Sequence, residues 1–192
     1  MTDSGVVVLL VLSALGLLLA RQSVQIVLAL TLQYALAGGL VMQMWPPRMA
    51  LIKIMAGWAA VLILYLSARR VPLGGDLPAG PGRFLARFSA GLLALLAVFS
   101  LLPVVQDAVP GITPPVLGAA MWLMLSALMQ LGFTLHPLRT AAGWLTLMTG
   151  FEIIYAAIER SILIALLLAA LQMALALAGA YLLLQGASEE EA

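Results

Sequence analysis

Several residue types that carry chemistry are absent or rare in this chain of 192 residues. Cysteine is absent, which excludes disulfides, thiolate metal sites, iron–sulfur clusters and cysteine nucleophiles. The single histidine, His136, does not supply a bis-histidine haem by itself. Only 9% of the residues are charged, against roughly 25% in soluble domains. This composition excludes a soluble enzyme or a nucleic-acid-binding module, and we expect no cofactor in the chain.

Apolar residues dominate what remains. They make up 64% of the chain, and the mean hydropathy is +1.14. A bilayer core about 30 Å thick needs about 20 consecutive apolar residues per helix. The apolar runs therefore predict an all-α, polytopic membrane protein with seven transmembrane helices, near residues 4–20, 23–43, 49–68, 85–104, 115–135, 138–158 and 161–185.

The last two predicted spans are separated by the weakest signal. Residues 138–185 contain no proline, and one unbroken helix of this length would be about 72 Å long, more than twice the hydrocarbon core. The chain must therefore turn back, and Glu159-Arg160-Ser161 is the polar cluster that allows it.

The distribution of basic residues predicts the orientation, because cytoplasmic loops accumulate lysine and arginine. With the N-terminus outside, only Arg48 and Arg160 fall in outer loops. Six basic residues then fall on the inner side: Arg21, Arg69, Arg70, Arg83, Arg87 and Arg139. We therefore predict an external N-terminus and a cytoplasmic C-terminus, in the inner (cytoplasmic) membrane of a cell.

A glycine- and proline-rich stretch, residues 71–84, is the clearest linker in the chain and is predicted to be cytoplasmic. A second proline-rich segment, Pro103 to Pro115, is predicted to be an interfacial loop on the outer side. The predicted organisation is a first three-helix unit, the linker, a connecting helix with its outer loop, a second three-helix unit and an acidic tail: 1–70, 71–84, 85–114, 115–186 and 187–192.

Two charged residues fall inside predicted spans, where an ionisable group is costly and is a functional candidate by default. Lys53 lies about 7 Å from the outer edge of its span, and Glu152 lies about 12 Å from the same side. Their similar depths and opposite signs predict that the two side chains pair or share a water-filled pocket. The alternatives are that Lys53 snorkels to the headgroups and that Glu152 makes a structural hydrogen bond only.

Uncharged polar residues repeat the spacing of the charged ones. Lys53 follows Gln33 by 20 positions, and Gln172 follows Glu152 by 20. This correspondence suggests a parallel 3+1+3 repeat, in which the fourth span joins two similar units. The four residues are the candidates for an ion pathway. No catalytic residue and no metal ligand set is recognised.

Contact with partners is predicted for the lipid bilayer and for other membrane proteins, and no nucleic acid is expected. Ala170, Ala174 and Ala178 form a stripe of small residues on the seventh predicted span. Such a stripe lets another helix approach closely. We interpret it as a contact surface for other membrane subunits.

The segment from Arg139 to Ala157 resembles subunit K of NADH–quinone oxidoreductase and the related small subunit of multi-subunit sodium/proton antiporters. In each, a basic residue at the start of an apolar helix is followed about four turns later by a glutamate, here Glu152. The chain as a whole resembles the hydrogenase-4 component E family, which has an extended version of that unit. Gln33 and Lys53 match the glutamine and lysine of that family's first half, although no proline follows Lys53 within its span.

This resemblance implies a non-catalytic membrane subunit of a respiratory or antiporter-like complex that couples redox energy to ion movement. A protonatable carboxylate in a low-dielectric cavity, answered by a nearby amine, would be the ion-handling element. Two alternatives stay open from the sequence: a self-standing small secondary transporter, and a structural or assembly subunit without an ion role. A membrane-embedded enzyme is the least supported, because no catalytic motif is found.

Overall fold

The computed structural model describes residues 3–20, 22–70, 81–134, 136–159 and 161–190. This part of the chain folds into seven α-helices: α1 (Asp3–Leu19), α2 (Ser23–Val41), α3 (Pro47–Arg70), α4 (Pro81–Ala108), α5 (Pro114–Gly132), α6 (Pro137–Ile158) and α7 (Ile162–Glu190). The predicted all-α fold is confirmed. The predicted linker lies mostly outside the described residues, as do Arg21 and Arg160.

Six of the helices, α2 to α7, are long and apolar enough to cross a membrane. The apolar part of α1, Gly5–Leu19, is shorter. The complete α1 helix has 17 residues and is therefore about 26 Å long. Length and composition thus support a multi-pass membrane protein.

Prolines set the starts of four helices. Pro47, Pro81, Pro114 and Pro137 are the first residues of α3, α4, α5 and α6. Proline is favoured there because its fixed φ suits the first turn and its missing N–H would be unpaired anyway. No proline separates α6 from α7, and the polar cluster at 159–161 makes that break instead. The predicted turn is confirmed.

The end of α4 differs from the prediction. A loop beginning at Pro103 was expected, but α4 continues through Pro103 to Ala108, so that prediction is wrong. An internal proline removes one backbone hydrogen bond, and a long helix survives that loss when its end is held elsewhere. The Gln106 side chain donates to the Ile112 carbonyl over 2.8 Å and fixes the turn after α4. At the other end of the chain, α7 continues into the predicted tail as far as Glu190.

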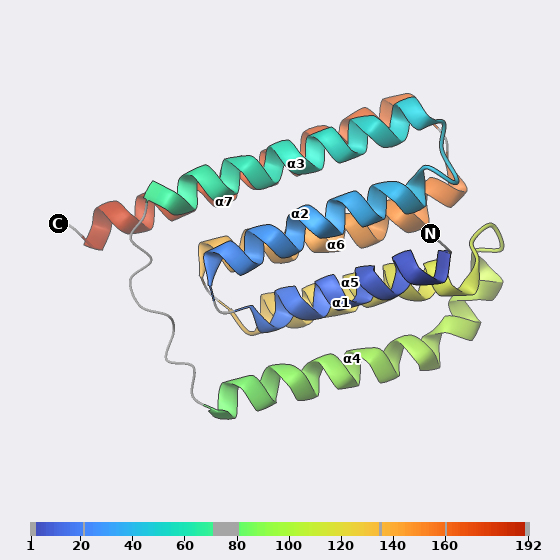
Figure 1. The fold of residues 1–192 in the computed structure, drawn as a ribbon, viewed down its shortest axis with the longest axis horizontal. Coiled ribbons are helices and arrows are strands. Elements are labelled where there is room, and N and C mark those ends of the chain that lie inside the picture. Colours follow the sequence, from blue (N-terminus) through green and yellow to red (C-terminus); the bar gives the residue numbers. More distant parts are fainter. Residues whose placement is uncertain (1–2, 21, 71–80, 135, 160, 191–192) are drawn as a thin grey trace.

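The helices form two layers (Figure 1). One layer contains α1, α2 and α3, and the other contains α5, α6 and α7. Each helix packs on its counterpart in the other layer: α1 on α5, α2 on α6 and α3 on α7. The paired helices run in the same direction, and α4 closes one edge against α1 and α5. This arrangement places α3, α6 and α7 next to one another.

The two ends of the bundle differ in charge. One end carries the start of α4, the start of α6 and the end of α3, with Arg87, Arg139 and the pair Arg69-Arg70. The other end carries the start of α3, with Arg48. We refer to these as the basic end and the opposite end.

Side chains at both ends tie helices together through backbone carbonyls. At the basic end, the Arg139 guanidinium donates to the carbonyl of Ala20, just after α1. Toward the opposite end, the Trp45 indole N–H donates to the Glu159 carbonyl at 3.0 Å, at the end of α6. Such bonds are needed in a membrane because lipid tails cannot pair a free carbonyl.

His136, half-buried immediately before α6, gives stability a pH dependence. Burial, and then the positive charge of Arg139, lower its pKa below the ordinary 6.5. The folded protein therefore prefers the neutral imidazole, and this contribution to stability is fully present above pH 6.5. As the pH falls below that value, the unfolded chain takes up a proton that the folded protein resists.

We therefore expect the free energy of unfolding to decrease between about pH 7 and pH 5.5, and the decrease to be smaller in His136→Gln. Thermal unfolding in detergent across this range measures it. An identical pH dependence in the variant would show that His136 is not the titrating group.

Candidate functional site

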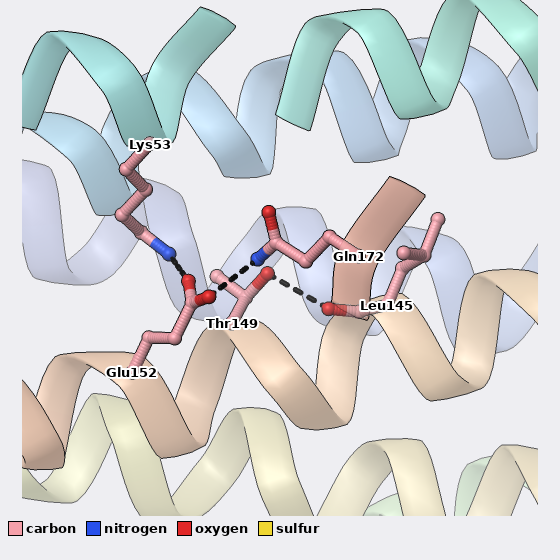
Figure 2. A network of polar contacts seen from close by, with 5 residues as sticks. All are labelled: Lys53, Leu145, Thr149, Glu152 and Gln172. Atoms are coloured by element: carbon pink, nitrogen blue, oxygen red, sulfur yellow. Dashed lines mark hydrogen bonds and ion pairs between the residues drawn. The ribbon is translucent and has the colours of Figure 1, made fainter. Parts of the chain in front are cut away.

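Three helices bring polar side chains to one point in the core (Figure 2). Lys53 of α3 forms an ion pair with Oε2 of Glu152, which projects from α6. Gln172 of α7 donates from Nε2 to the other carboxylate oxygen, Oε1, at 2.8 Å. The side chains of Lys53 and Glu152 are only 4–5% exposed, and Gln172 is 1% exposed. We call these three residues the carboxylate site.

The ion pair forms because its two charges lie at the same level. Lys53 is six residues after the start of α3, and Glu152 is six residues before the end of α6. Each is therefore about 9 Å from the opposite end of the bundle. The sequence-based depths of 7 and 12 Å differed because α3 begins earlier, and α6 ends earlier, than the flanking arginines indicate.

The buried face of α3 directs Lys53 inward. Ala50, Gly57, Ala60 and Leu64 recur with Lys53 at helical spacing and are all buried. The ammonium group therefore points at Glu152 rather than at the surface of the bundle. The alternative in which Lys53 snorkels to the headgroups is not the conformation observed.

Tyr34 of α2 forms one wall of the site. Its ring centroid lies 5.9 Å from Lys53 Nζ, which is within the range of a cation–π contact. The ring fits against α3 because residue 57 is glycine: a Cβ there would lie 2.2 Å from Tyr34 Cδ1. The Tyr34 hydroxyl lies beside Thr149, without an ordinary hydrogen bond to any described residue.

Gln33, the fourth sequence candidate, is not part of this hydrogen-bonded network. It is fully buried on α2, and neither its Oε1 nor its Nε2 has a hydrogen-bond partner among the described residues. The structure therefore joins Lys53, Glu152 and Gln172 and leaves Gln33 apart from them.

Sequence reasoning missed Tyr34, Gly57 and Thr149. Two of them had a detectable signal, since Tyr34 follows Gln33 directly and Gly57 lies one helical turn after Lys53. Thr149 lies three residues before Glu152 and donates its hydroxyl to the Leu145 carbonyl at 2.8 Å. Its place beside Tyr34 depends on how α2 faces α6, which sequence periodicity does not specify.

The carboxylate site is suited to a proton rather than to a metal ion. Each Glu152 oxygen already accepts from a nitrogen donor, and one of these donors is an ammonium group. A sodium or divalent ion needs several oxygen ligands, and it would be repelled by that ammonium. The described residues contain no group of three or more His, Asp or Glu side chains placed to hold a metal ion.

The predicted alanine stripe lies on the outside of the bundle. Ala170, Ala174 and Ala178 are all exposed, whereas Gln172 and Ala176 form the buried face of α7. The stripe therefore does not pack within this chain. Its surroundings would be lipid or another protein.

A separate open pocket of about 650 Å³ lies toward the basic end, between α5, α6 and α7. Its lining includes Thr140, Trp144 and Gln185. Thr140 is twelve residues, or about 18 Å along α6, from Glu152. The pocket is therefore not continuous with the carboxylate site.

Comparison with known proteins gives no further assignment. No family model, curated protein or solved structure matches this chain. Any function must therefore be inferred from the carboxylate site and the architecture.

Proposed function

We propose that this chain is a non-catalytic integral-membrane subunit of a multi-subunit ion-translocating complex, in which Glu152 and Lys53 contribute to ion coupling. The observation that carries this proposal is the buried ion pair, which lies between apolar helices and is assembled from separate parts of the chain. Ionisable residues at such depth are expensive and usually serve ion pathways. The resemblance to the hydrogenase-4 component E family agrees with this reading.

Proton transfer within the pair is the step that such a subunit would use. With the pair ionised, Glu152 is a carboxylate and Lys53 an ammonium. Moving one proton from Nζ to Oε2 leaves both groups neutral and changes the field felt by neighbouring groups. Because the site is nearly dry, a small displacement of either helix would shift this balance strongly. Neighbouring subunits would provide the entry and exit of protons.

The proposed topology follows from the charges at the two ends. The basic end would face the cytoplasm and the opposite end the outside, in an inner membrane, with all seven helices spanning it. The two layers would be a parallel repeat, since α1, α2 and α3 lie on α5, α6 and α7 in the same order and direction. In that repeat, Gln33 would correspond to Glu152 and Lys53 to Gln172.

Replacing Glu152 with Gln tests the proposal, because glutamine keeps the shape and cannot carry the proton. We expect the host complex, isolated in mild detergent, to keep its set of subunits while its ion-coupled activity falls about 100-fold, the lower range for a positioned proton-transferring group. Ion uptake by reconstituted vesicles is the measurement. The control is Glu159→Gln, the same change at the edge of α6.

A double variant, Lys53→Met with Glu152→Gln, guards against misfolding of the single variant, because it removes both charges together. It should assemble and be equally inactive. Unchanged ion uptake in either assembled variant would contradict an ion role.

One observation favours a second candidate, an assembly subunit with no ion role. Both Glu152 oxygens are satisfied within the chain, as expected for a clamp that joins α3, α6 and α7. In that case Glu152→Gln would reduce the amount of assembled complex, and the complexes that form would keep full ion uptake.

A further inference from the structure

Polar atoms without partners are concentrated between α2 and α6. Among the described residues, no group hydrogen-bonds the Gln33 amide or the Thr146 hydroxyl, and their side chains are 0% and 1% exposed. Gln172 Oε1 is also unpaired, although the Nε2 of the same side chain binds Glu152. An unpaired polar group in an apolar interior costs several kcal/mol, so each of these atoms requires a partner.

These atoms lie at neighbouring levels of the bundle. Measured from the opposite end, Gln33 is eight residues deep on α2, Thr146 twelve residues deep on α6 and Gln172 ten residues deep on α7. These counts correspond to about 12, 18 and 15 Å. All three therefore lie just beyond the carboxylate site, within about two helical turns of it.

The faces of α2 and α6 that carry Gln33 and Thr146 are turned toward each other. The two helices pack together, and the Tyr34 hydroxyl beside Thr149 marks where they meet. Gln33 is adjacent to Tyr34 on the buried stripe of α2, and Thr146 is one turn from Thr149 on the buried face of α6. The levels of Gln33 and Thr146 differ by about 6 Å, which leaves space for a bridging group between them.

We propose that ordered water molecules bind between α2 and α6, held by the Gln33 amide and the Thr146 hydroxyl, and extend the polar core beyond the carboxylate site. Water supplies both donors and acceptors, as an amide and a hydroxyl together require, and buried water normally makes two to four hydrogen bonds to such groups. The fixed neighbours of Gln33 on its stripe, Leu30 and Ala37, offer only apolar side chains. This site does not depend on the proposed ion coupling, because a structural subunit would need the same waters.

Water-edited solid-state NMR of isotopically labelled protein in liposomes tests the site. Magnetisation from water should reach the Gln33 side-chain amide, identified by its loss in Gln33→Leu, as early as it reaches side chains at the bundle ends. The Leu64 methyl groups, fully buried in an apolar cluster of α2, α3, α6 and α7, provide the slow reference. Transfer to Gln33 that is as slow as transfer to Leu64 would overturn the proposal.

Thr146→Val tests whether the two residues share the water, since valine keeps the shape and lacks the hydroxyl. We expect the early transfer to Gln33 to be lost or clearly delayed. The matched control is Ser126→Ala, because the Ser126 hydroxyl is buried but already donates to the Leu123 carbonyl at 3.1 Å. Early transfer to Gln33 that persists unchanged in Thr146→Val would contradict a shared site.

Discussion

Replacing Lys53 alone with methionine is expected to lower the free energy of unfolding by about 3–5 kcal/mol. The loss is large because Glu152 is then left with a buried charge that Gln172 alone must stabilise. Making the second change, Glu152→Gln, should recover most of this loss, since two neutral groups of similar shape can share the site. Equilibrium unfolding in mixed detergent micelles, followed by circular dichroism, measures the three variants.

The double-mutant cycle also separates this pair from an ordinary surface ion pair. A coupling energy of several kcal/mol is expected for the buried pair, whereas exposed pairs contribute about 0–1 kcal/mol. Additive effects of the two single changes would contradict the observed contact. Arg48→Met, at the start of the same helix, provides a control in which a positive charge is removed outside the core.

Introducing valine at Gly150 is expected to destabilise the protein by about 3 kcal/mol, through overpacking between α5 and α6. A Cβ at this position would lie 2.7 Å from the Ala120 carbonyl oxygen and 2.8 Å from Met124 Cγ. Met124 can rotate away, but a backbone carbonyl in a helix cannot, so α6 must move away from α5. Any displacement of α6 also displaces Glu152, two residues later. Thermal unfolding of the purified variant measures the loss.

Gly39→Ala provides the matched control for this prediction. Gly39 also lies inside a helix, α2, but a Cβ there has no atom within 4 Å. Alanine restricts the unfolded chain without a clash, and a gain of about 0.5–1 kcal/mol is expected. If both variants change stability in the same direction, close packing at Gly150 is not the cause.

The spans were predictable from sequence because hydrocarbon imposes a length and a composition on every helix. The turn between α6 and α7 was recognised by the same reasoning, since one helix cannot be twice the bilayer core. The continuation of α4 past Pro103 was not, because the effect of an internal proline depends on contacts beyond its own helix. Gln106, which holds the end of α4, gave no signal in the sequence.

The candidate site was predictable only as far as polarity and depth define it. Lys53 and Glu152 were identified because charge is rare in these spans, and their common depth indicated that they pair. Gln172 was found by its spacing, but its bond to Glu152 depends on helix rotation. Tyr34 and the outward-facing alanine stripe depend on the same rotation. A span that is apolar all round carries little periodic signal to specify it.

The distance between the Lys53 ammonium and the Glu152 carboxylate tests the central claim most directly. Protein labelled with ¹⁵N in lysine and ¹³C in glutamate can be measured in liposomes by dipolar dephasing between Nζ and Cδ, with Lys53→Met identifying the signal. We predict strong dephasing of the Glu152 carboxyl carbon, as for atoms within about 4 Å of each other. A Glu152 signal unaffected by Lys53 would show that the two helices do not meet at these residues, and it would contradict the carboxylate site.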